Sequence, residues 1–255
     1  DEAFGYFGAP SHTLTLTAQD VYNIAKQKDV TAADYNYDGK VDLYKEMAFG
    51  HAYYASSFDK GGKTTYLHDI VGAYMDGRDM LVEADANALS DSQRDQLKAY
   101  AKIIKTNWEK VIAEAVFKYA GETYEDMVKI EAILESNGDV AKAWRNYAKH
   151  WGELKGFALA LQVGGKDMGA VSVRLNRLIG HSPLLLGNTQ VTGVDSNGEY
   201  IQSNSESWGG YMAHMLKVQN LMVDEFAVVA KSHDQTAGLA ELVKTLGGKS
   251  SAEND

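Results

Sequence analysis

An acidic segment at residues 34–46, DYNYDGKVDLYKE, begins with an aspartate or asparagine at every second position. Asp34, Asn36 and Asp38 alternate with other residues, and Gly39 follows directly. In calcium loops of the EF-hand type, positions 1, 3 and 5 supply side-chain oxygens, and a glycine at position 6 allows a sharp turn. The segment therefore predicts a calcium site.

The rest of the segment extends this pattern and departs from it at one point. Position 7 supplies a backbone carbonyl and position 9 an oxygen ligand, whereas position 12, which should be a bidentate acid, is Lys45. Glu46 follows one residue later and takes that role in our interpretation. The predicted ligands are Asp34, Asn36, Asp38, the Lys40 carbonyl, Asp42 and Glu46. The alternative is an Asx-rich turn without an ion. A single loop without a second copy favours a structural ion over a paired sensor.

A second candidate site lies in the segment HWGE, where His150 and Glu153 are three residues apart. On a helix, this spacing places both side chains on one face, where they could share a metal ion. The alternative is a half-buried polar pair beside the apolar stripe of Trp151. The chain contains no His-Glu-x-x-His, Gly-x-Ser-x-Gly or P-loop pattern. No familiar set of catalytic residues is therefore indicated.

The bulk composition excludes several classes of function. The formal net charge of −10 argues against nucleic-acid binding, which requires a positive field. The chain has no cysteine, so disulfides and thiolate metal sites are excluded, and an oxidising bacterial envelope or exterior is favoured. No apolar run is long enough to predict a transmembrane helix. The sequence gives no indication of the oligomeric state.

The elements that must hold these residues are mostly helical. Apolar residues recur at steps of three and four, and only two prolines interrupt the chain. We expect helices over about 66–86, 90–120, 123–136, 140–161, 167–179 and 206–231. The predicted fold is all-α, an up-and-down bundle of long helices with one EF-hand-like loop and one long irregular loop at 181–207. Residues 1–243 are predicted to form a single helical domain, followed by a mobile tail at 244–255.

Four segments together resemble a known group of proteins. They are DEAFGYFGAP (1–10), DGKVDLYKE (38–46), HWGELKGFALALQ (150–162) and GHSPLLLGN (180–188). They resemble an uncharacterised bacterial envelope family allied to the imelysins, the insulin-cleaving peptidase-like or iron-regulated proteins. The resemblance implies an imelysin-like helical domain and a chain that continues upstream of residue 1. It also implies export to the periplasm, outer-membrane surface or exterior, often as a lipoprotein, and a connection with iron or haem uptake. The imelysin signature Gly-x-His-x-x-Glu has Ala148 in place of its glycine here.

Three functions follow as hypotheses. The first is a non-catalytic, calcium-stabilised envelope protein connected with iron or haem acquisition, with iron or haem as a ligand and an envelope or outer-membrane protein as a partner. The second is a metallopeptidase of imelysin type, which would use His150 and Glu153. The third is a structural or interaction module of the cell surface. We expect the start of loop 181–207 to pack on the helices and the remainder to be exposed, as a binding loop or a tolerated insertion.

Overall fold

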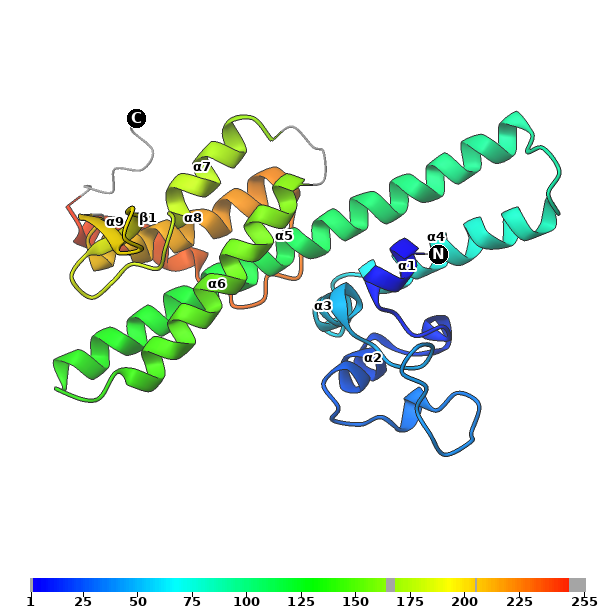
Figure 1. Ribbon diagram of the computed structural model, residues 1–255, viewed down its shortest axis with the longest axis horizontal. Coiled ribbons are helices and arrows are strands. Elements are labelled where there is room, and N and C mark those ends of the chain that lie inside the picture. The colour runs from blue at the N-terminus through cyan, green and yellow to red at the C-terminus, as the bar shows by residue number, and fades with distance from the viewer. Residues whose placement is uncertain (1, 164–167, 205, 248–255) are drawn as a thin grey trace. The chain divides into compact units, whose positions relative to one another are not determined.

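The computed structural model describes residues 2–163, 168–204 and 206–247, and most of these residues are helical (Figure 1). The predicted all-α class is therefore confirmed, whereas the bundle topology stays a prediction. The chain divides into two compact units, residues 1–111 and 112–255. The expected single domain over residues 1–243 stays a prediction. Of the expected mobile tail, residues 248–255 lie outside the described residues.

The N-terminal unit is built from short helices around a small core. Its α-helices are α1 (Glu2–Phe7), α2 (Ala18–Ala25), α3 (Gly50–Asp59), α4 (Tyr66–Glu83) and the first part of α5 (Asp91–Glu135). Helices α2 and α3 contact one another, and α4 contacts α3. The core consists of fully buried apolar side chains, among them Phe7, Val21, Ile24, Ala52, Leu67 and Ile70. Burial of these side chains is the main force that orders the unit.

The C-terminal unit has one almost completely buried helix at its centre. It contains the remainder of α5, α6 (Ala141–Val163), α7 (Ala170–Ile179), α8 (Trp208–Phe226) and α9 (Leu239–Thr245). Helix α8 is buried along most of its length and contacts both α7 and α9. A helix that is apolar on nearly all sides must be covered by other elements. The segments around α8 are therefore held in place by its burial.

Two helices begin at reciprocal caps formed by side chains three residues apart. The Thr17 hydroxyl accepts a hydrogen bond from the Asp20 amide, and the Asp20 carboxylate accepts one from the Thr17 amide, which completes a capping box at α2. Ser90 and Gln93 form the same reciprocal pair where α5 begins. These side chains satisfy amides that the first helical turn leaves without a backbone partner.

Two sequence-based expectations about the elements were wrong. We expected a helix to end at Gly121 and another to begin at 123, but α5 continues from Asp91 to Glu135. The irregular loop at 181–207 contains an antiparallel hairpin of β1 (Thr189–Val194) and β2 (Tyr200–Asn204).

Gly121 serves close packing and does not end the helix. A Cβ atom at this position would lie 2.1 Å from the His233 carbonyl oxygen and 2.6 Å from Gln219 Nε2. The segment that follows α8 thus passes directly over α5 at this point. Only a residue without a side chain permits that approach.

We expect Gly121→Ala to destabilise the C-terminal unit by about 1–3 kcal/mol, because overpacking outweighs the gain in helix propensity. The measurement is the free energy of unfolding in urea. Gly152→Ala is the matched control, since nothing lies within 4 Å of a Cβ atom there. That control should be neutral or stabilising by up to about 1 kcal/mol. Equal effects of the two substitutions would contradict this role of Gly121.

Candidate functional site

The predicted calcium loop folds around the first of its aspartates. Asp34 Oδ1 accepts a hydrogen bond of 3.1 Å from the Asp38 amide, and Oδ2 accepts one of 2.9 Å from the Gly39 amide. Gly39 has a φ of 79° and Tyr37 a φ of 59°, so the backbone turns sharply twice within three residues. This turn returns the chain to the Asp34 carboxylate, as the glycine of the motif requires.

Glu46 connects the two ends of the loop. Its Oε1 accepts a hydrogen bond of 3.1 Å from the Tyr35 amide, and its Oε2 accepts one of 2.8 Å from the Asp42 amide. Only 5% of Glu46 is exposed, whereas Lys45 is exposed. The carboxylate one residue beyond the usual position therefore faces the loop, and the lysine faces solvent.

The other predicted ligands take part in turns of the same segment. Asn36 Oδ1 accepts from the Asp38 amide, Asp38 Oδ1 from the Lys40 amide, and Asp42 Oδ1 from the Tyr44 amide. A carboxylate can accept about four hydrogen bonds or metal contacts, so these oxygens keep further capacity. Within the described residues, no group of three or more His, Cys, Asp or Glu side chains is placed to hold a metal ion. Calcium at this loop stays a prediction.

His150 lies in a cluster of charged side chains in the C-terminal unit. Its Nδ1 is 2.6 Å from Asp126 Oδ2, and its Nε2 is 3.7 Å from Glu122 Oε2. His233, which follows α8, has its Nε2 3.1 Å from Glu122 Oε1 and its Nδ1 3.1 Å from Glu125 Oε1. The two imidazole rings thus lie near different oxygens of the Glu122 carboxylate. The Nδ1 atom of each ring lies near a second carboxylate, that of Asp126 for His150 and that of Glu125 for His233.

Glu153, the other residue of the predicted pair, has a different environment. Its Oε2 is 3.8 Å from Lys149 Nζ and is buried without a hydrogen-bond partner among the described residues. In the described part of the structure, neither carboxylate oxygen of Glu153 forms a hydrogen bond with His150. The structure brings His150 together with α5 residues that are distant in sequence, and the metal role of His150 and Glu153 stays a prediction.

Sequence analysis missed the partners of His150. Glu125 and Asp126 follow Glu122 by three and four residues, so all three share one face of α5. This spacing could have indicated an acidic cluster from the sequence. His233 follows α8 in a segment without regular periodicity. Only the three-dimensional path of that segment over α5 brings it to Glu122.

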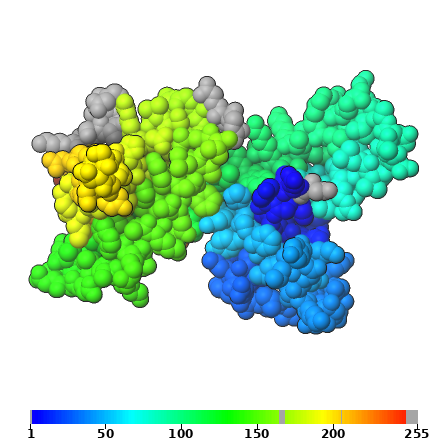
Figure 2. Space-filling view, in the orientation of Figure 1, coloured from blue at the N-terminus to red at the C-terminus, as the bar shows by residue number. Residues whose placement is uncertain are grey.

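The segment at 181–207 is anchored at its start and exposed at its end. Leu184 is completely buried, and its carbonyl oxygen accepts a hydrogen bond of 3.2 Å from the buried Tyr147 hydroxyl. All residues of β2 are exposed, and the hairpin lies at the surface of the C-terminal unit (Figure 2). The expected division is correct only in part: Leu184 is packed as expected, but Leu186 is 48% exposed, and Gln190, beyond the part expected to pack, is buried. Residue 205 lies outside the described residues.

The hairpin should be removable without loss of the helices. Val191 and Gln202 are paired across the two strands, so replacing residues 192–201 by Asn-Gly gives a two-residue hairpin turn. We expect the helical circular dichroism signal to be unchanged and the free energy of unfolding to differ by no more than about 0.5 kcal/mol. Loss of helical signal in this variant would show that the hairpin is needed for folding.

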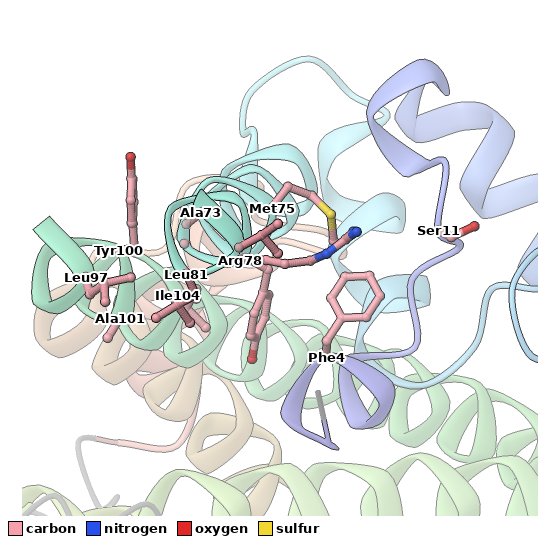
Figure 3. A pocket seen from close by; sticks show the side chains of 13 residues that line it. Phe4, Ser11, Ala73, Met75, Arg78, Leu81, Leu97, Tyr100, Ala101 and Ile104 are labelled. Atoms are coloured by element: carbon pink, nitrogen blue, oxygen red, sulfur yellow. The ribbon is translucent and has the colours of Figure 1, made fainter. Parts of the chain in front are cut away.

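An open groove in the N-terminal unit has mostly apolar walls (Figure 3). Its volume is about 720 Å³, and its lining includes Phe4, Tyr74, Arg78, Leu97 and Ile104. Arg78 extends toward the Phe4 ring. Among the described residues that line the groove, there is no histidine or carboxylate that could act as a general base.

In comparisons with known proteins, no family model, curated protein or solved structure matches the chain. Within the described ranges, no helix combines the length and the apolar character that crossing a membrane requires.

Proposed function

We propose that the protein is a non-catalytic protein of the bacterial cell envelope, stabilised by one Ca²⁺ ion and connected with iron or haem acquisition. The observation that carries the calcium part is the folding of the loop around Asp34, whose two oxygens accept the Asp38 and Gly39 amides. These contacts join the first position of the loop to the fifth and the sixth, and they support the proposal because a calcium loop of the EF-hand type also turns sharply at its sixth residue.

The donor set fits a hard cation. Asp34, Asp38, Asp42 and Glu46 contribute four negative charges within thirteen residues, and a divalent cation would relieve their mutual repulsion. Asn36 and the Lys40 carbonyl would add neutral oxygens. Glu46 would supply the carboxylate that closes the loop, because it already faces the segment from its far end. Calcium bound in this way would hold α3 to the preceding chain.

The location in the envelope and the connection with iron or haem rest on the resemblance to imelysin-allied proteins. The mostly apolar groove, whose described lining includes no histidine or carboxylate, is compatible with a protein that binds a ligand or an envelope partner and does not transform it. A surface structural or interaction module would use the same loop and groove without iron or haem.

Elemental analysis of the purified full-length protein, combined with haem titration, tests this proposal. We expect about one calcium per chain in wild type and none in Asp38→Ala. Lys45→Ala is the matched control in the same segment and should retain the ion. Haem addition should produce a saturable absorbance change. Calcium-free wild-type protein after dialysis against calcium would overturn the calcium part, and the absence of a haem or iron response would overturn the acquisition part.

A metal-dependent peptidase is the second candidate function, and the cluster around His150 favours it. The carboxylate of Asp126, 2.6 Å from His150 Nδ1, fixes the tautomer that leaves Nε2 as the ligand atom. Glu122 and His233 could complete the set of ligands. Their side chains would first have to move toward a common centre, because the described residues hold no group that is already placed around a metal ion. A peptidase would also need a general base and an open metal position.

Peptide cleavage assays with added Zn²⁺ distinguish the two candidates. The non-catalytic proposal predicts no metal-dependent cleavage by wild type. Cleavage that is lost in His150→Ala and in Glu122→Gln would establish the peptidase at the cluster. Cleavage that is lost in Glu153→Gln but retained in Glu122→Gln would place it at the pair predicted from the sequence.

A further inference from the structure

An open cavity of about 480 Å³ lies at the surface of the C-terminal unit, between α6, α7 and the segment that follows α7, and its lining residues Val173, Arg177 and His181 are exposed. It is lined by Lys155, Val173, Asn176, Arg177, Gly180, His181 and Gln190. Among the described residues, the lining contains two cationic side chains and a histidine but no aspartate or glutamate. The chain as a whole has 35 acidic and 25 basic residues. The described lining of the cavity is therefore positively charged, whereas the chain as a whole has a net negative charge.

Lys155 is the lining residue with the most informative environment. It is half-buried, and its Nζ donates to the Gly180 carbonyl oxygen at 2.8 Å and to Asn176 Oδ1 at 3.5 Å. Both acceptors are neutral, and no carboxylate forms an ion pair with Lys155 within the described residues. Burial lowers the pKa of Lys155, as expected for an ammonium group without a compensating negative charge.

A purely structural role explains only part of this arrangement. Gly180 is the residue at which α7 ends, and a cation at a helix C-terminus is favourable. An ammonium group has three donors, and the two contacts to α7 and its cap leave one available. The structural role also requires neither the cavity nor the basic side chains of Arg177 and His181 beside it. A half-buried charge without a counter-charge has a free-energy cost that an anionic ligand would offset.

We propose that this cavity binds the oxyanion group, phosphate or carboxylate, of a small anionic molecule. Lys155 is the point charge that holds the group, and the planar guanidinium of Arg177 suits the same oxyanion from the cavity edge. The cavity is larger than an oxyanion, so the remainder of the molecule lies against Val173. The site contains no residue of the calcium loop and stands independently of the calcium proposal.

Titrations of the full-length protein followed by ¹H–¹⁵N NMR test this site. The probes are inorganic phosphate, acetate and, as a control, chloride, all at constant ionic strength. We expect phosphate or acetate to shift the amides of Lys155, Gly180 and His181 in a saturable manner, with a Kd in the millimolar range or below. Chloride should not do so. Tighter binding of phosphate indicates a phosphate-bearing ligand, and tighter binding of acetate indicates a carboxylate-bearing one.

Two variants and a matched control assign the binding to the cavity. Lys155→Gln should weaken binding by about tenfold or more, because it removes a charge-assisted hydrogen bond. Arg177→Gln should also weaken binding while leaving the bond from Lys155 to Gly180 in place, so it separates ligand binding from capping of α7. Lys142→Gln makes the same charge change on an exposed part of α6 and should leave the Kd unchanged.

The proposal is overturned if wild type gives no saturable shift with phosphate or acetate at tens of millimolar. It is equally overturned if Lys142→Gln weakens binding as much as Lys155→Gln, because that result would reflect net charge alone.

Discussion

Replacing Glu114 by alanine should lower the free energy of unfolding of the C-terminal unit by about 3–5 kcal/mol. Glu114 lies on α5 and is completely buried. Its Oε1 accepts hydrogen bonds from the amides of Val229 and Ala230, and its Oε2 accepts one from the amide of Lys231. The substitution would leave three backbone donors without this acceptor and a cavity in the core. Urea unfolding followed by tryptophan fluorescence is the measurement.

Glu131→Ala is the matched control, since this glutamate is exposed on the same helix. We expect it to change the free energy of unfolding by no more than about 0.5 kcal/mol. Hydrogen exchange gives a second readout, because the amides of Val229–Lys231 should lose protection only in Glu114→Ala. A loss of stability below about 1 kcal/mol in Glu114→Ala would show that water or another group replaces the carboxylate.

Glu46→Ala should destabilise the N-terminal unit by about 2–4 kcal/mol. The buried carboxylate accepts the Tyr35 and Asp42 amides and so joins the start of the calcium loop to its end. Both amides should exchange faster with solvent in the variant. Lys45→Ala, a change at the neighbouring exposed residue, should have little effect. Comparable destabilisation by both variants would show that the segment tolerates no change and that Glu46 has no special role.

The helices were largely predictable because their signals are local. The apolar period, the capping box at Thr17 and the reciprocal pair of Ser90 and Gln93 all act within a few residues. Gly121 shows the limit of this reasoning. A glycine within a helical pattern signals either a helix end or a close approach, and only the passing His233 carbonyl determines which one applies.

The candidate sites were predictable to different degrees, depending on whether their residues lie close together in the sequence. The predicted ligands at 34–46 are close together in sequence, and the expectation that Glu46 rather than Lys45 faces the loop agrees with its contact to the Asp42 amide, whereas calcium binding stays a prediction. The cluster of His150 joins α5, α6 and the segment after α8, which are far apart in sequence. The hairpin at 189–204 was missed because its strands are short and its second strand has no buried face. Alternation of buried and exposed residues, the usual signal of a strand, is therefore absent there.

Thermal unfolding of calcium-free and calcium-loaded protein tests the central proposal most directly. The four carboxylates of the loop should repel one another without a cation, so calcium should stabilise the N-terminal unit. A free calcium concentration one hundred times the Kd adds about 2.7 kcal/mol, which raises the Tm of a unit of this size by roughly 10–20 °C. Asp38→Ala should melt at the same temperature with and without calcium. Identical melting curves of wild type in calcium and in chelator would contradict the account.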